Sequence, residues 1–428
     1  MTLAQVVVVV VVVVPLLLAF LEKIKIDTAA LLILCLLGLA QYAGLGIFAP
    51  AGTPGAATRA LTGFGQPVVI TLIGLFILTY CLDRAGVTRW IAARVLRLAG
   101  TSERRLIGLF TLTAALLSLF MNNVAAGALL IPSALEAARR TGTAPSKLLM
   151  PISFGTLLGG AATYFTTANI IASDLLTTAN PPQAPLHILD FTPTGGFMAL
   201  AGIAFIVLLG PRLLPNRTPQ SIPIADTTAP QMSQRDAILS VVVTALAITA
   251  AILGVPTSLA VLAGALVLIL IGVVSMREVY QAIEWRVIFP VAGIYSVGLA
   301  MVGTGLAALI GQALIGIAGP FGPLGLVVEV FLITALLTQF IGGQVAANVT
   351  GPIAISAAIA AGTNPQAIAV VTAIGCSAAF FTPLAHPVNL LMIDVGGYKF
   401  SDFPRVGIGL FIVCFVALVI AVPLFWKL

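Results

Sequence analysis

Residues 118–140 read SLFMNNVAAGALLIPSALEAARR and place two adjacent asparagines between two apolar runs. A buried amide without a hydrogen-bond partner is costly, so Asn122 and Asn123 require either polar partners or a ligand. Paired arginines, Arg104-Arg105 and Arg139-Arg140, bound the two apolar arms. This stretch raises the question of where its two arms lie relative to a membrane.

The composition of the chain answers part of that question. The 428 residues are 60% hydrophobic and only 8% charged, which a water-soluble domain cannot tolerate on its surface. No basic segment precedes the first apolar run, which favours a membrane helix over a cleavable signal peptide. The runs are unbroken and lack alternation, so the sequence predicts an all-α polytopic membrane protein. Ten crossings of about 30 Å of hydrocarbon are expected near 3–20, 28–48, 66–82, 148–176, 196–214, 237–254, 257–275, 287–303, 366–393 and 404–426.

An internal repeat appears when the sequence is shifted by 220 residues. Residues 105–169 then match 325–389 without a gap, and Pro132 falls on Pro352 and Asn169 on Asn389. The match predicts a first repeat at 1–212 and a second at 236–428. Residues 213–235 are Pro-rich and polar, as expected for a cytoplasmic linker.

The two repeats differ in the charge of their loops. Residues 83–147 contain nine Lys or Arg residues, whereas 303–365 contain none. The positive-inside rule places the first set of loops in the cytoplasm and the second outside, with both termini outside. Arg59 is an exception to this pattern. Inverted-topology repeats are typical of secondary transporters, which bind substrate near the midplane where the halves meet.

Because both arginine pairs belong on the cytoplasmic side, residues 105–139 are predicted to form a re-entrant hairpin that turns at 121–123 inside the protein. The second repeat supplies an equivalent hairpin at 322–360, with its tip at 342–344. An interrupted helix follows each hairpin, at 148–176 and 366–393, with polar breaks expected at 166–169 (TTAN) and 386–389 (HPVN). Broken helices free backbone carbonyls for a cation and N–H groups for an anion.

The order of these motifs resembles the divalent-anion/sodium symporter family of the ion transporter superfamily. The resemblance rests on NNVAAGALLIP, GGAATYFTTAN, FFTPLAHPVN and GGYKFSDFPRVG, and it covers nearly the whole chain except that family's first helix. Members carry Ser-Asn-Thr at both hairpin tips and Thr-Pro-Pro-Asn-like turns, so Asn123, Asn169 and Asn389 match. The resemblance also implies a homodimer in which a scaffold of outer helices holds a transport domain of hairpins and broken helices.

These observations define a candidate site. The substrate-binding residues are predicted to be Asn122, Asn123, Val124, Thr166, Thr167, Gly343, Gln344, His386 and Pro387. The sodium ligands are predicted to be Asn123, Asn169, Gly343 and Asn389. Helix–helix hydrogen bonding, helix capping or a satisfied core imidazole are the structural alternatives for these side chains.

The predicted function is secondary transport of a small anion, such as a dicarboxylate or a sulfate-like ion, coupled to Na⁺ across the plasma membrane. No Walker A motif and no nucleophile or metal-ligand constellation is present, so we expect no enzymatic activity, no metal centre and no cofactor. The net charge of +6 is explained by topology, and nothing indicates nucleic-acid binding. No clear buried carboxylate is predicted, which counts against the alternative, a sodium/proton antiporter or an oxyanion or arsenite efflux permease.

Overall fold

The computed structural model describes residues 1–21, 23–86, 102–217, 233–318 and 321–428, and within them all regular elements are helices. Most of the linker predicted at 213–235 lies outside these residues. The first half contains α1 (Leu3–Phe20), α2 (Ile26–Tyr42), η1 (Ala57–Gly65), α3 (Pro67–Arg84), α5 (Glu103–Ser118), α6 (Asn123–Thr141), α7 (Ser146–Ala161), α8 (Thr167–Thr177) and α9 (Phe191–Leu213). The second half contains α10 (Gln234–Ile252), α11 (Thr257–Leu270), α12 (Met276–Ala282), α13 (Trp285–Gly303), α14 (Leu306–Ala318), α15 (Gly322–Ile341), α16 (Gly343–Ala361), α17 (Pro365–Ser377), η3 (Pro383–Ala385), α18 (Pro387–Gly396) and α19 (Asp402–Phe425).

Eight helices within the described residues are long and apolar enough to cross a membrane. They include both arms of the second hairpin, α15 and α16, whose lengths of 20 and 19 residues therefore do not distinguish re-entry from a full crossing. On α19, Ile408, Ile412 and Val416 recur every four residues and are each about half exposed. Such an apolar stripe on the outside of the molecule suits contact with lipid.

The helix boundaries follow the 220-residue shift. Helix α6 begins at Asn123 and ends at Thr141, and α16 begins at Gly343 and ends at Ala361. Helices α8 and α18 begin at Thr167 and Pro387. The two halves thus repeat a helix pair followed by an interrupted helix, while the orientation of each half in a membrane stays a prediction.

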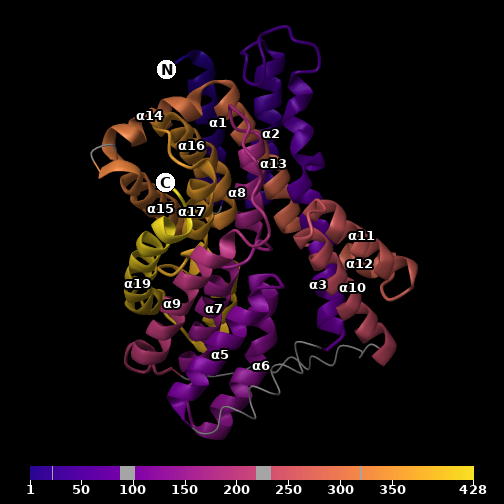
Figure 1. The fold of residues 1–428 in the computed structure, drawn as a ribbon, viewed down its shortest axis with the longest axis vertical. Coiled ribbons are helices and arrows are strands. Elements are labelled where there is room, and N and C mark those ends of the chain that lie inside the picture. The colour runs from indigo at the N-terminus through magenta and orange to yellow at the C-terminus, as the bar shows by residue number, and fades with distance from the viewer. Residues whose placement is uncertain (22, 87–101, 218–232, 319–320) are drawn as a thin grey trace.

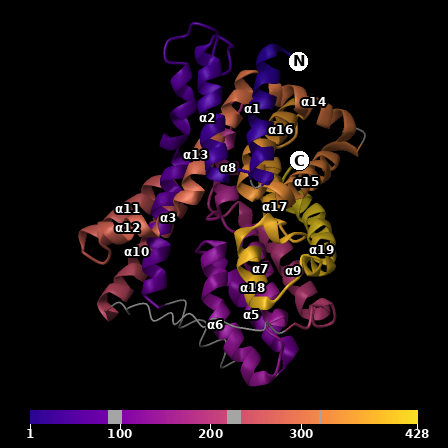
Figure 2. The same cartoon turned by 180° about the vertical axis from the view of Figure 1, so that it is seen from behind.

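Most of the helices, all but α9, α14 and α19, are grouped here into two sets (Figure 1). The first, here called the scaffold set, comprises α1–α3 and α10–α13, in which α2 packs on α13 and α3 on α11. The second, the hairpin set, comprises α5–α8 and α15–α18, in which α7 packs on α5 and α17 on α15 and α16. Figure 2 shows α18 of the second half lying beside α7 of the first. The sets meet where α16 packs on α13 and α8 on α3.

The helix breaks lie earlier than the sequence patterns indicated. The first break covers 162–166 rather than 166–169, because α8 already begins at Thr167 with Thr166 at its N-cap position. The second covers 378–386 rather than 386–389, because Pro387 is the first residue of α18. Proline is favoured at a first helical position, since its missing N–H has no partner there in any case. Residues taken as interrupting a helix therefore start one.

Candidate functional site

A cavity of about 540 Å³ lies between the scaffold set and the hairpin set. Residues of α1, α3 and α13 line one side of it, and the tips and breaks of the hairpin set line the other. All of the predicted substrate-binding residues line this cavity: Asn122, Asn123, Val124, Thr166, Thr167, Gly343, Gln344, His386 and Pro387. Asn169 and Asn389 do not line it and are fully buried behind it.

Four helices begin at the cavity. Their first residues, Asn123 of α6, Thr167 of α8, Gly343 of α16 and Pro387 of α18, all belong to its lining. A helix N-terminus carries unsatisfied N–H groups and the positive end of the helix dipole. The convergence of four such ends makes the cavity attractive to an anion without requiring many formal charges.

The side chains of the tips and breaks satisfy some of these N–H groups and leave others available. Asn122 Oδ1 accepts a hydrogen bond of 2.7 Å from the Val124 N–H, and His386 Nδ1 accepts one of 3.2 Å from Val388. The His386 ring proton therefore belongs on Nε2, where it is a donor at the cavity lining. No side chain caps α8 or α16, so the first N–H groups of these two helices remain available to a ligand.

The first hairpin tip is tied to the first break. The Thr163 hydroxyl donates a 2.8 Å hydrogen bond to the Leu119 carbonyl at the end of the incoming arm. The Ser118 hydroxyl donates a 2.5 Å bond to Asn123 Oδ1. A Cβ atom at Gly160 would lie 2.7 Å from the same oxygen, so glycine is needed for this close approach.

Asn169 braces the first break and keeps one oxygen unused. Its Nδ2 donates to the carbonyls of Gly160 and Thr163, at 3.2 and 2.5 Å. Both of these groups are acceptors only, which determines the orientation of the amide. Asn169 Oδ1 is buried and has no hydrogen-bond partner within the described residues. An unpaired amide oxygen beside backbone carbonyls is a suitable ligand for Na⁺.

Asn389 braces the second break in the same way, but all its polar atoms have partners. Its Nδ2 donates to the carbonyls of Ala379 and Thr382, at 2.8 and 3.2 Å. Its Oδ1 accepts a 2.6 Å hydrogen bond from the hydroxyl of Ser153 on α7. Of the two predicted sodium ligands behind the cavity, Asn389 is therefore already satisfied by the protein.

A further amide closes the second break. Gln339 Nε2 donates a 2.9 Å hydrogen bond to the Ala378 carbonyl, and Gln339 Oε1 accepts one of 3.0 Å from the Phe381 N–H. The tip itself turns at Gly342, whose φ of +78° suits glycine. At Gly343 a Cβ atom would lie 2.7 Å from the Cys376 carbonyl, so this tip packs directly on the end of α17.

Several residues of this site could not be recognised from the sequence. Glu284 and Arg286, at the start of α13, line the cavity, and burial raises the pKa of the Glu284 carboxyl. No described residue forms a salt bridge with Arg286. Their position at the edge of an apolar run indicated a membrane boundary but gave no sign of a shared cavity. Ser153 and Gln339 had no motif of their own, because their role depends on contacts across helices.

Comparison with known protein sequences shows which family model and which transporters this chain resembles. A family model described as citrate transporter matches residues 16–375. An uncharacterized transporter of Synechocystis is 23% identical, over 96% of this chain and 94% of its own length. Sodium/sulfate cotransporter 1 of Chlamydomonas reinhardtii is 33% identical over 149 residues, which are 35% of this chain and 17% of that protein.

Solved structures agree on the architecture. The YdaH transporter of Alcanivorax borkumensis aligns with a TM-score of 0.61 over 96% of this chain and 98% of its own, at 17% identity. MtrF of Neisseria gonorrhoeae, described as one of a class of antimetabolite efflux pumps, aligns with a TM-score of 0.57, at 17% identity over 93% of this chain and 94% of its own. At this identity the likeness concerns the fold.

The family match confirms the resemblance to the divalent-anion/sodium symporters of the ion transporter superfamily. The family consists of transporters, which are not enzymes. The helix content and the apolar spans agree with a multi-pass membrane protein. The chain belongs to the citrate transporter family.

Proposed function

We propose that the protein is a secondary transporter of a small anion, such as a dicarboxylate or a sulfate-like ion. The observation that carries this proposal is the convergence of four helix N-termini on one cavity. Arg286 adds a positive charge to the lining, and the His386 ring adds a donor. The named activity of the sodium/sulfate cotransporter supports the same class of substrate.

Na⁺ is the proposed coupling ion, and it binds at the first break. Asn169 Oδ1, the carbonyls of the break and Asn123 Oδ1 supply oxygen ligands there. At the second break the equivalent amide oxygen, Asn389 Oδ1, already accepts a hydrogen bond from Ser153. The proposal therefore assigns Na⁺ to the first half of the protein.

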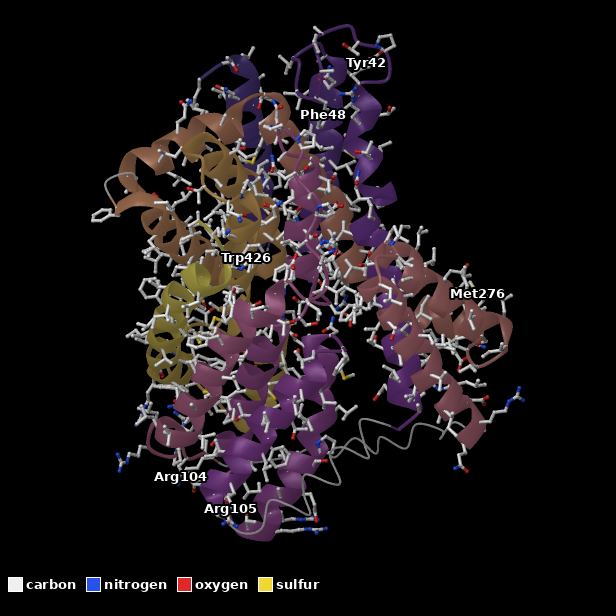
Figure 3. All side chains as sticks on the ribbon, in the orientation of Figure 1. Tyr42, Phe48, Arg104, Arg105, Met276 and Trp426 are labelled. Atoms are coloured by element: carbon white, nitrogen blue, oxygen red, sulfur yellow. The ribbon has the colours of Figure 1, made fainter. Side chains whose placement is uncertain are left out.

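The proposed topology is an inverted repeat in the plasma membrane, with two re-entrant hairpins and both termini outside. Arg104 and Arg105 project from the lower end of the molecule, opposite Tyr42 at the upper end (Figure 3). If the charged end is cytoplasmic, the hairpin set moves against the scaffold set to expose the cavity alternately to each side. A homodimer of scaffold sets would hold this mobile part in place.

The decisive experiment measures uptake of labelled citrate, dicarboxylates and sulfate into proteoliposomes, with and without a Na⁺ gradient. We expect Na⁺-dependent uptake of at least one anion, and weaker dependence on Na⁺ in Asn169→Ala. Exchange of Na⁺ for protons without anion flux would refute anion transport and favour an antiporter. For the topology, a cysteine at Ser133 should react only from the cytoplasmic side. Reaction from outside would make the first hairpin a full crossing.

A further inference from the structure

Asp174 is a buried carboxyl group that the proposed site does not use. It lies on α8 and is 8% exposed, and its Oδ2 has no hydrogen-bond partner among the described residues. Asp174 could not be recognised from the sequence, because one acidic residue in an apolar helix does not show which neighbours cover it. The structure shows that other helices cover it almost completely.

Tyr295 of α13 faces this carboxyl. The two side chains are close enough to interact, yet the Tyr295 hydroxyl, in a residue only 2% exposed, has no hydrogen bond of good geometry within the described residues. Asp174 belongs to the hairpin set and Tyr295 to the scaffold set. The pair therefore spans the boundary at which the two sets would slide.

The surroundings of the pair are tightly packed. A Cβ atom at Gly298 of α13 would lie 3.2 Å from the side chain of Leu175, and one at Gly351 of α16 would lie 2.5 Å from it. Asn348, one turn before Gly351 on α16, is also buried and its Oδ1 is unpartnered within the described residues. Three helices, α8, α13 and α16, thus each bring an unsatisfied polar atom to the region around Leu175.

Among the described residues, no positive charge forms a salt bridge with Asp174. Helix α16 has no ionizable side chain and α17 has only Cys376, while Arg84 of α3 pairs with Glu278. The titratable groups that face Asp174 from the described elements around it are Tyr295 and Tyr164, neither of which is a cation at neutral pH. A buried carboxylate without a cation carries a large desolvation penalty, which protonation removes.

We propose that Asp174 is a proton-binding site, loaded when α8 lies against α13 and released when the hairpin set moves away. This inference rests on the proposed transport function, because it uses the same movement. Loading forms one O–H bond on the Asp174 carboxylate with a proton from water, and release returns that proton. No electrons are transferred. The transport cycle then carries a proton in addition to Na⁺ and the anion.

Infrared difference spectroscopy of the full chain in lipid tests the site without any transport assay. We expect a carboxylic-acid C=O band that shifts in deuterated water and titrates between about pH 5 and about pH 9, a range that covers buried carboxyl groups. Asp174→Asn should remove the band, Asp174→Glu should restore a titrating band, and Tyr295→Phe should shift its frequency. Asp190→Asn is the matched control, because Asp190 is only partly buried and its bond to His187 N–H suits an amide oxygen equally well.

A wild-type protein without such a band, or a band that persists in Asp174→Asn, would overturn the proposal. If Asp174→Asn does not fold, Tyr295→Phe decides, because an unshifted band would show that the acid lies elsewhere. Proteoliposomes containing a pH-sensitive dye provide the second readout. Proton flux should disappear in Asp174→Asn while Na⁺ binding is retained, and retained proton flux would contradict the assignment. A band that depends on Asp174 in a protein without anion uptake would support the proton site and refute only the proposed substrate.

Discussion

The two helix breaks differ in one hydroxyl group, which a single substitution can add to the first break. Ser153 on α7 satisfies Asn389, and the 220-residue shift that relates α7 to α17 carries Ser153 to Ala373. Alanine has no hydroxyl, so by the repeat we infer that Asn169 Oδ1, which has no partner within the described residues, lacks the donor that Asn389 has. The substitution Ala373→Ser should supply the missing hydrogen-bond donor, so that Asn169 Oδ1 is satisfied as Asn389 Oδ1 is by Ser153.

The expected effect follows from competition for one oxygen. A neutral hydrogen bond contributes about 0.5–1.5 kcal/mol net, and Na⁺ would have to displace it before binding to Asn169 Oδ1. The dissociation constant for Na⁺ should therefore rise roughly twofold to tenfold, since about 1.4 kcal/mol corresponds to a factor of ten. The free energy of unfolding without Na⁺ should stay the same or rise, because a buried acceptor gains a partner.

Radioactive sodium binding to the purified protein, together with the Na⁺ dependence of thermal unfolding, measures this constant independently of the anion. Ala369→Ser is the matched control, because Ala369 is equally buried and lies one turn earlier on α17. An Ala373→Ser protein that is folded and binds Na⁺ with unchanged affinity would refute Asn169 Oδ1 as a ligand. The same change in Ala369→Ser would show that any added hydroxyl disturbs the helix.

Three further predictions concern a buried hydrogen bond, the packing of a hairpin tip and the protonation of Glu278. Ser153→Ala should lower the free energy of unfolding by about 1–3 kcal/mol in denaturant titrations, because it leaves the buried Asn389 Oδ1 without a hydrogen-bond donor. An unchanged free energy of unfolding would show that this hydrogen bond does not stabilise the protein. Gly343→Ala should cost about 1–3 kcal/mol by overpacking against α17, whereas Gly316→Ala, with open space around it, should be neutral or stabilising. Hydrogen bonds from the backbone and side chain at the start of α12 hold the pKa of Glu278 below 4.5. Its stabilisation should persist above that pH and disappear below it, so unfolding midpoints of Glu278→Gln should depend less on pH in acid.

The repeat could be predicted from the sequence because its signal is long and regular. The gapless shift predicted two helix pairs, each followed by an interrupted helix, and α6 and α16 begin at two positions that the shift relates, Asn123 and Gly343. The polar residues at the tips also line one cavity as a group. Composition and periodicity carry this information, since each hairpin is a local arrangement of helix, turn and helix.

Contacts between distant helices could not be predicted in this way. The Ser153 hydroxyl meets Asn389 across 236 residues, and Leu175, which follows Asp174, packs on α13 and α16, which come much later in the chain. The breaks were placed too late because Thr167 and Pro387 disrupt a continuing helix and equally well begin a new one. Only the packed structure shows which of the two roles applies.

The asymmetry between the halves has a consequence for charge. A hydroxyl-to-carbonyl bond ties arm to break in both halves, from Thr163 to Leu119 and from Thr382 to Gln339, so the backbone of the site is repeated. The side chains differ: within the described residues, Asn169 at the first break has an unpaired buried oxygen, whereas Asn389 at the second break does not. If one Na⁺ binds at Asn169 and one proton binds to Asp174, the charges carried together with a dianion sum to zero per cycle, although the proton neutralises Asp174 and only Na⁺ offsets the charge of the anion. Protonation of Asp174 and binding of Na⁺ each reduce the uncompensated negative charge on the loaded hairpin set, and uncompensated charge is expensive in hydrocarbon. The proposed cycle is therefore electroneutral for a dianion, and it becomes electrogenic when Asp174 cannot hold its proton.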